Sequence, residues 1–118
     1  MLERELPFYF SRWEEEDQAF AGRFLDGWRN SDALRHFNEH IAAEMDLRPA
    51  LARIAAPTLV ITGERDFFGA STAQELADAL PNATAVVLPD AGHFVFGEAR
   101  SLQVWTRAIL DFLSSESV

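Results

Sequence analysis

The stretch that decides the fold is residues 57–66, PTLVITGERD. Its β-branched and apolar run, residues 58–62, ends at Gly63 and predicts a short strand buried on both faces. Polar residues follow, so a loop is expected at the carboxyl end of this strand. Residues 83–93, ATAVVLPDAGH, repeat the pattern with a second apolar run and a second polar loop. Two strands are therefore predicted, each followed by a loop.

A helical pattern follows each apolar run. The first helix is expected to begin at a capping box, for which Thr72 with Glu75, or Ser71 with Gln74, has the required spacing. The inner apolar stripes are Ala73, Leu76, Ala77 and Leu80 in the first helix and Leu102, Trp105, Ile109 and Phe112 in the second. Alternation of strands and helices with short loops predicts parallel strands joined by a right-handed crossover.

The first third of the chain has helical spacing instead. Three amphipathic helices are predicted, with Ser31 or Asp32 capping the second and Asp46 capping the third. Their apolar stripes are Trp13, Phe20, Phe24 and Trp28; Leu34, Phe37, Ile41 and Met45; and Leu47, Leu51 and Ile54. The acidic run Glu14 to Asp17 is interpreted as a solvated face of the first helix rather than a binding site for a substrate amine.

Two parallel strands are too few to form an independent sheet, because helices normally cover both faces of a parallel sheet. Leu6 to Phe10 is a weak candidate for a third strand. We therefore expect the two strands to belong to a larger sheet, completed by residues outside this chain or by a second copy. The alternative is that the N-terminal helices wrap the strand pair into a compact domain.

Composition restricts the possible functions. The 118 residues carry a net charge of −9, which argues against binding to nucleic acid. The chain has no Cys, so disulfides, thiolate metal sites and a Cys nucleophile are excluded. No apolar stretch is long enough to span a membrane, and the N-terminus lacks the pattern of a secretory signal. These features predict a cytoplasmic protein without membrane contact.

The two loops contain the candidate catalytic residues. Ligands bind beyond the carboxyl ends of the strands in open α/β sheets, and both loops are expected at that rim. Asp66 lies in the first loop and His93 in the second, 27 residues apart. A carboxylate that accepts a hydrogen bond from one imidazole nitrogen leaves the other nitrogen free to take a proton from a nucleophile. On residue types alone, a surface contact without function is the favoured interpretation.

Residues 46–113 resemble the C-terminal part of α/β-hydrolase fold serine hydrolases of the proline iminopeptidase and esterase type. Residues 54–66 are similar to the penultimate strand and its acid loop; residues 80–94 and Glu98 are similar to the last strand and the histidine loop. The resemblance implies an α/β fold, namely the C-terminal strand-helix-strand-helix portion of an α/β-hydrolase parallel sheet. It also implies a helical cap segment over residues 1–45 and a core segment over residues 46–118.

The same resemblance implies that Asp66 is the acid and His93 the general base of a catalytic triad, with no metal or organic cofactor. The family's nucleophile motif, Gly-x-Ser-x-Gly, is absent from the 118 residues, as is its oxyanion-hole loop. The nearest approach is residues 69–73, GASTA, in which Ser71 is interpreted as a helix cap. A missing N-terminal hydrolase portion is therefore expected to supply the serine, and this chain alone should be inactive.

Other interpretations remain open. Phe67, Phe68 and Phe94 flank the two loops and either line a pocket for a small-molecule ester, amide or peptide or pack beneath the cap. His36 and His40, in the pattern H-x-x-E-H, are a less favoured zinc site. Glu98 is expected to cap or pair near the last helix. The whole chain can instead be a non-catalytic α/β module that binds a partner or self-associates.

Overall fold

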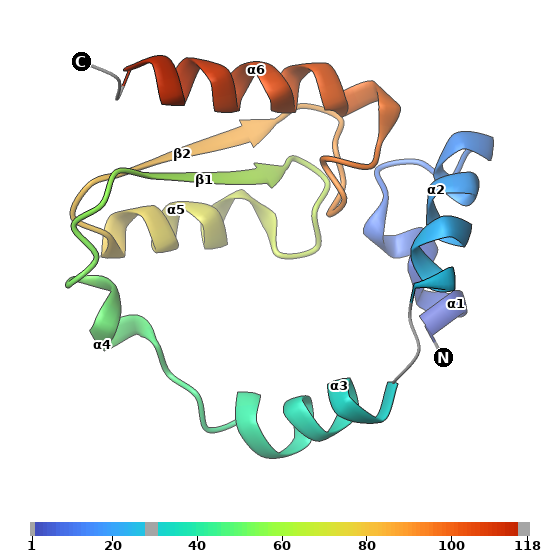
Figure 1. Ribbon diagram of the computed structural model, residues 1–118, viewed down its shortest axis with the longest axis horizontal. Helices are drawn as coiled ribbons and strands as arrows, with labels where there is room; N and C mark the ends of the chain where they lie inside the picture. Colours follow the sequence, from blue (N-terminus) through green and yellow to red (C-terminus); the bar gives the residue numbers. More distant parts are fainter. Residues whose placement is uncertain (1, 28–30, 116–118) are drawn as a thin grey trace.

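The computed structural model, which describes residues 2–27 and 31–115, contains one parallel pair of strands among those residues. Strand β1 (Thr58–Gly63) pairs with strand β2 (Ala83–Leu88), in register from Thr58 opposite Ala83 to Gly63 opposite Leu88. The two strands and their parallel pairing are as the sequence predicts. The carboxyl ends of both strands, and the loops that follow them, lie at one rim of the sheet (Figure 1).

Two helices lie on opposite faces of this pair. Helix α5 (Gly69–Ala79) connects the strands along one face, and helix α6 (Ala99–Ser115) lies along the other (Figure 1). The buried residues beneath α6 are Leu88, Ala91 and Val95, with Ile61, Val86 and Trp105 packed against them. The stripe of α5 is buried as expected, apart from Leu76, which is exposed. This part of the fold is thus a parallel strand pair with one helix on each face.

Neither predicted capping box begins helix α5. The helix begins at Gly69, so Ser71 and Thr72 lie inside its first turn. The Thr72 hydroxyl donates a hydrogen bond to the Phe68 carbonyl, 2.6 Å away, instead of capping a backbone N–H. The earlier start has a local cause. Gly69 adopts a φ of +74°, which glycine takes at little cost, and its N–H bonds to the Asp66 carbonyl.

Leu6 to Phe10 do not form a strand. Helix α1 (Leu2–Glu5) and the 3₁₀ helix η1 (Leu6–Tyr9) lead instead into helix α2 (Glu15–Asp26). Pro7 explains the difference, because it lacks a backbone N–H for a strand ladder but is tolerated in the first turn of a helix. The core of this region contains Leu6, Phe10, Ala21 and Phe94, with Tyr9, Phe20, Phe24 and Leu25 packed against it.

The acidic run at the start of α2 is only partly solvated. Glu14, Glu15 and Glu16 are exposed, but Asp17 is buried and forms an ion pair with Arg100. The solvated-face interpretation is therefore wrong for Asp17, because its partner lies 83 residues away in sequence. Of the predicted stripe, Trp13 precedes the helix, and Trp28 lies outside the described residues.

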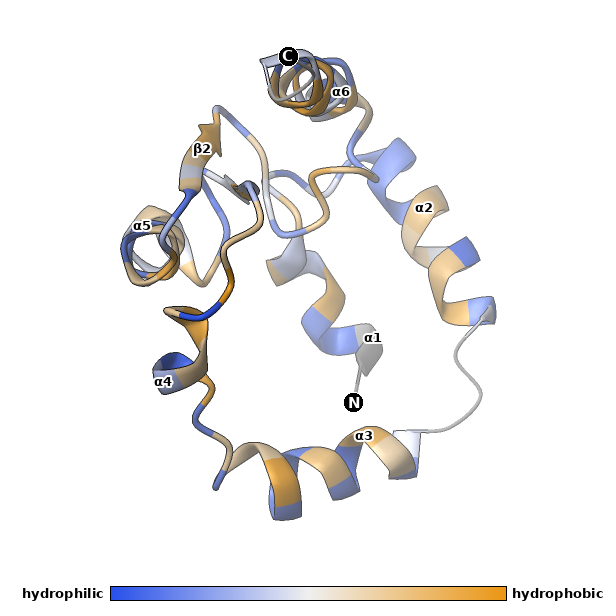
Figure 2. Cartoon of the chain, turned by 60° about the vertical axis from the view of Figure 1, so that its left-hand side comes forward, coloured by the Kyte–Doolittle hydropathy of each residue, from blue (hydrophilic) through white to orange (hydrophobic). Residues whose placement is uncertain are grey.

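The middle helices follow an arc away from the strand pair and back to it (Figure 1). The arc consists of α3 (Ser31–Phe37), the π-helical turn η2 (Asn38–Ala42) and α4 (Arg48–Leu51). Helix α4 ends before Ile54 and has Leu47 at its N-cap, although the Asp46 side chain accepts the Arg48 N–H. The apolar stripe predicted for the second helix, Leu34, Phe37, Ile41 and Met45, is exposed. Hydrophobic and hydrophilic segments alternate along these helices (Figure 2).

The N-terminal helices do not wrap the strand pair into one core. Their buried cluster and the cluster beneath α6 are separate groups of residues. Residues 58–61 of β1 are only half-buried, so the expectation of a strand buried on both faces is wrong for the described structure. Among the described helices, none is long and apolar enough to cross a membrane.

The loops after the two strands are bound to each other. The N–H of Arg65 donates to the carbonyl of Ala91 at 2.8 Å, and the Asp90 N–H donates to the Glu64 carboxylate at 2.9 Å. Gly63 makes this approach possible. A Cβ at Gly63 would lie 2.2 Å from the carbonyl oxygen of Gly92, a distance that requires backbone movement.

Replacing Gly63 by alanine should therefore separate the two loops. We expect the G63A variant to lose about 1–3 kcal/mol of unfolding free energy in urea denaturation, the usual range for overpacking a tight site. G22A is the matched control, because a Cβ at Gly22 meets nothing within 4 Å in the interior of α2. That control should gain about 0.5–1 kcal/mol. Equal stability of the two variants would contradict the close approach of the loops.

Candidate active site

Asp66 and His93 meet at the rim formed by the two loops. The His93 Nδ1 lies 3.1 Å from one carboxylate oxygen of Asp66 and 3.2 Å from the other. The Asp66 side chain is 9% exposed and that of His93 is 32% exposed. The acid is thus largely shielded, while the imidazole remains accessible. This contact brings together the two residues that the sequence places at the ends of different strands.

Local bonds fix the orientation of the acid. One Asp66 oxygen accepts the backbone N–H of Phe68 at 3.1 Å, and the other accepts the Thr62 hydroxyl at 3.4 Å. An ionised carboxylate only accepts hydrogen bonds, so the group between it and Nδ1 must be an N–H of the imidazole. In the neutral ring, Nδ1 then carries the proton and Nε2 has a free lone pair. The arrangement therefore prepares Nε2 to accept a proton.

Aromatic rings surround the imidazole. Phe67 stacks on His93 with ring centres 4.8 Å apart, and Tyr9 meets it edge-on at 5.4 Å. Phe68 is 5.7 Å away, and both phenylalanines of this loop are more than half exposed. Phe94 differs because it is 7% exposed and belongs to the N-terminal core. Phe94 is therefore a packing residue, whereas Phe67 and Phe68 border the accessible imidazole.

Tyr9 is a site residue that the sequence analysis missed. Its ring also contacts Phe67, at 5.0 Å, and its carbonyl accepts the backbone N–H of His93 at 2.7 Å. No sequence motif marks it, because the contact joins segments 84 residues apart and depends on the 3₁₀ turn at η1. The N-terminal segment is thus a direct part of the histidine environment.

Buried charges lie behind the histidine loop. Glu98 is fully buried and forms an ion pair with Arg100, which confirms the expectation that Glu98 pairs near the last helix. Arg100 also binds Asp17 of α2. Burial alone would lower the pKa of Arg100, but hydrogen bonds and charges of Asp17 and Glu98 raise it above its ordinary value. Arg100 is therefore fixed as a cation between two carboxylates.

The two candidate zinc residues lie next to each other on the exposed arc. The rings of His36 and His40 lie 4.7 Å apart, and both side chains are exposed. Within residues 2–27 and 31–115, the structure brings together no group of three or more His, Cys, Asp or Glu side chains suited to a metal ion. Two exposed imidazoles leave a structural zinc ion short of its usual four ligands.

The described residues place no serine hydroxyl in hydrogen-bond contact with His93. Ser11 bonds to Glu98 and Arg100, and Ser101 bonds to backbone carbonyls at the start of α6. Ser71 lies within the first turn of α5. The described part of the chain therefore pairs a carboxylate with an imidazole and brings no serine hydroxyl to that imidazole.

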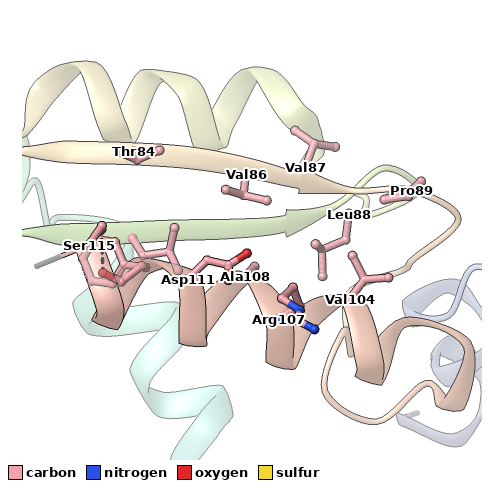
Figure 3. Close-up of a pocket in the computed structure, with 12 residues that line it drawn as sticks. Thr84, Val86, Val87, Leu88, Pro89, Val104, Arg107, Ala108, Asp111 and Ser115 are labelled. Atoms are coloured by element: carbon pink, nitrogen blue, oxygen red, sulfur yellow. Dashed lines mark hydrogen bonds between the residues drawn. The ribbon is translucent and has the colours of Figure 1, made fainter.

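An apolar groove lies away from this site, between α6 and the strand pair (Figure 3). Its volume is about 500 Å³. Val86 and Leu88 of β2 and Val104 of α6 point into it (Figure 3). The groove is separate from Asp66 and His93, neither of which lines it.

Comparison with known proteins defines the class. The profile of the Alpha/beta hydrolase family matches residues 1–104, and the chain belongs to this family. The protein named "Putative carbamate hydrolase RutD" from Pseudomonas savastanoi pv. phaseolicola (strain 1448A / Race 6) is 35% identical over 103 residues. That match covers 86% of this chain and 38% of RutD.

Two solved structures have the same fold. MenH from S. aureus matches with a TM-score of 0.57 and 30% identity over 63% of this chain and 27% of MenH. The "Putative non-heme bromoperoxidase BpoC" from Mycobacterium tuberculosis H37Rv matches with a TM-score of 0.57 and 25% identity, over 90% of this chain and 47% of BpoC. The chain thus spans less than half the length of each of these relatives.

Replacing Asp66 by asparagine should remove the preference for one imidazole tautomer. In the wild-type chain we expect ¹⁵N NMR of neutral His93 to show a protonated Nδ1 and a bare Nε2, and therefore two widely separated ¹⁵N shifts. In D66N the two shifts should converge, because an amide can donate as well as accept. D90N is the control, because Asp90 lies at the same rim but pairs with Arg12 and Arg65. Unchanged shifts in D66N would contradict the proposed hydrogen bond.

Proposed function

We propose that Asp66 and His93 are the acid and general base of a serine hydrolase acting on a small-molecule ester, amide, peptide or carbamate. The observation that carries this proposal is the 3.1 Å contact between the His93 Nδ1 and the shielded Asp66 carboxylate. Membership of the Alpha/beta hydrolase family supports it, because enzymes of this fold use a nucleophile, an acid and a histidine in that chain order. The carbamate is included because the RutD relative is named for that substrate.

In this mechanism, His93 Nε2 takes the proton of a serine hydroxyl as the oxygen attacks the substrate carbonyl. Asp66 holds the ring through Nδ1 and stabilises the imidazolium that forms. The proton then passes from Nε2 to the leaving group, and the carbonyl–leaving-group bond breaks to give an acyl-enzyme. In the second half, His93 Nε2 takes a proton from a water molecule as the water oxygen attacks the acyl carbon. The bond between that carbon and the serine oxygen then breaks, Nε2 returns the proton to the serine oxygen, and the acyl group leaves as an acid.

The serine itself is proposed to come from outside residues 1–118. Support comes from the sequence, which contains no Gly-x-Ser-x-Gly motif, and from the relatives, because the match covers less than half of each of them. Residues 46–118 would then complete the acid and histidine side of the sheet. Residues 1–45 would belong to the helical cap, and this chain alone would be inactive.

Exposed apolar surface supports docking of a further hydrolase portion. The groove between α6 and β2 and the exposed stripe of α3 and η2 both offer apolar area that water would otherwise solvate. The same surface favours a second candidate function, a non-catalytic module in which one copy of this chain associates with another. A measurement of catalysis distinguishes the hydrolase from the self-associating module, because only the hydrolase requires Asp66 and His93 to act on a serine.

Phe67 and Phe68 are proposed to line the substrate side of this site. Both rings are exposed and lie within 6 Å of the imidazole, measured between ring centres. Exposed aromatic surface beside a reactive group favours an apolar substrate moiety over a charged one.

A hybrid enzyme tests the proposal. Residues 1–118 would replace the matching part of the RutD relative, whose remaining chain would supply any serine motif. We expect the hybrid to hydrolyse p-nitrophenyl acetate and H93A to lower kcat by about 10³-fold or more, as loss of a triad member does. H40A is the control, because that imidazole is exposed in the arc. A hybrid that keeps its rate with H93A would overturn the proposed role of His93.

The isolated chain should not react with a fluorophosphonate probe. Phosphonylation needs an activated serine, and none of the described hydroxyls bonds to His93. Intact-mass spectrometry after incubation with the probe measures this directly, and the hybrid serves as the positive control. A stoichiometric mass increase on the isolated chain would contradict the proposed origin of the nucleophile.

A further inference from the structure

Glu98 is a buried carboxylate with an unusually complete set of partners. It is 0% exposed and directly precedes helix α6. One of its oxygens accepts the backbone N–H of Gly92 at 2.7 Å and that of Ser11 at 3.3 Å. The other accepts the Ser11 hydroxyl at 2.6 Å and the guanidinium of Arg100. The proposed hydrolytic steps do not use this group, so its burial requires another explanation.

The bond to Gly92 links Glu98 to the proposed base, because Gly92 directly precedes His93. The space around Gly92 is filled, since a Cβ there would lie 2.6 Å from a Glu98 oxygen and 2.6 Å from the Ser11 nitrogen. The next N–H, that of His93, is held by the Tyr9 carbonyl. Two consecutive N–H groups of the histidine loop are therefore fixed, one by Glu98 and one by the N-terminal segment.

The charge of Glu98 is balanced from the cap side. Arg100 binds Glu98 with one nitrogen and Asp17 of α2 with another. Removing one partner of such a buried pair is strongly destabilising, since the other charge is left uncompensated. Glutamine, the neutral side chain of the same shape, would also place its amide N–H₂ against a donor. Each Glu98 oxygen accepts from a group that only donates, the Ser11 N–H on one side and Arg100 on the other. The site therefore requires an acceptor that carries a full negative charge.

We propose that Glu98 is a positioning residue for His93: its carboxylate ties the histidine loop at Gly92 to Ser11 and sets the backbone from which the imidazole reaches Asp66. Only the naming of His93 as the base rests on the proposed function. The competing explanation is that Glu98 only anchors α2 and the N-terminal segment to α6. That role would leave the imidazole in place as long as the chain stays folded.

Paired substitutions separate these explanations. E98Q and D17N each neutralise one buried carboxylate bound to Arg100, but only Glu98 accepts the Gly92 N–H. The measurement is the separation of the His93 Nδ1 and Nε2 shifts in ¹⁵N NMR of the full chain, with urea denaturation of each variant. We expect E98Q to lose most of this separation and D17N to keep it at a comparable loss of stability.

Equal shift separations in folded E98Q and D17N would overturn the inference. If E98Q does not fold, E98D replaces it, because aspartate keeps the charge but is one methylene shorter and retracts from the Gly92 N–H. Loss of the separation in folded E98D supports a positioning role, and retention contradicts it. D66N distinguishes failure of this inference from failure of the proposed function. If D66N abolishes the separation of the His93 ¹⁵N shifts and the Glu98 variants keep it, only the positioning role of Glu98 is contradicted.

Discussion

The close approach of two loops at the carboxyl ends of a parallel strand pair is the constraint on which the site depends. A Cβ at Gly63 would lie 2.2 Å from the carbonyl oxygen of Gly92, and the Arg65 N–H bonds across the gap to the Ala91 carbonyl. Parallel pairing in register places both loops at one rim. This proximity lets a carboxylate from one loop reach an imidazole from the other, and the Asp66–His93 contact follows from it.

The rim alone does not hold the imidazole. The histidine loop is also bonded to the N-terminal segment, through the Tyr9 carbonyl and through Glu98 and Ser11. A triad base needs a fixed ring as well as a nearby acid, because proton transfer depends on its orientation. The N-terminal segment can thus affect the proposed chemistry without contacting a reacting atom, by fixing the backbone on both sides of Gly92.

The sequence predicted the elements whose signals are local. Apolar runs bounded by Gly63 and Pro89 gave both strands within one residue, and their spacing placed Asp66 and His93 at one rim. The sequence-based predictions failed where burial or position depends on contacts between residues far apart in the chain. Asp17 appeared solvated because its partner, Arg100, lies far along the chain, and Tyr9 carried no motif. The start of α5 was missed because a left-handed Gly69 replaced the expected side-chain cap.

The most direct test of the central claim is a crystal structure of the hybrid hydrolase after reaction with a fluorophosphonate. The account predicts a phosphonylated serine from the relative's part of the chain, with His93 Nε2 within about 3.2 Å of its Oγ, as in a nucleophile–base pair. Asp66 should remain hydrogen-bonded to Nδ1. A phosphonylated serine with His93 turned away, or with Asp66 and His93 apart, would contradict the account.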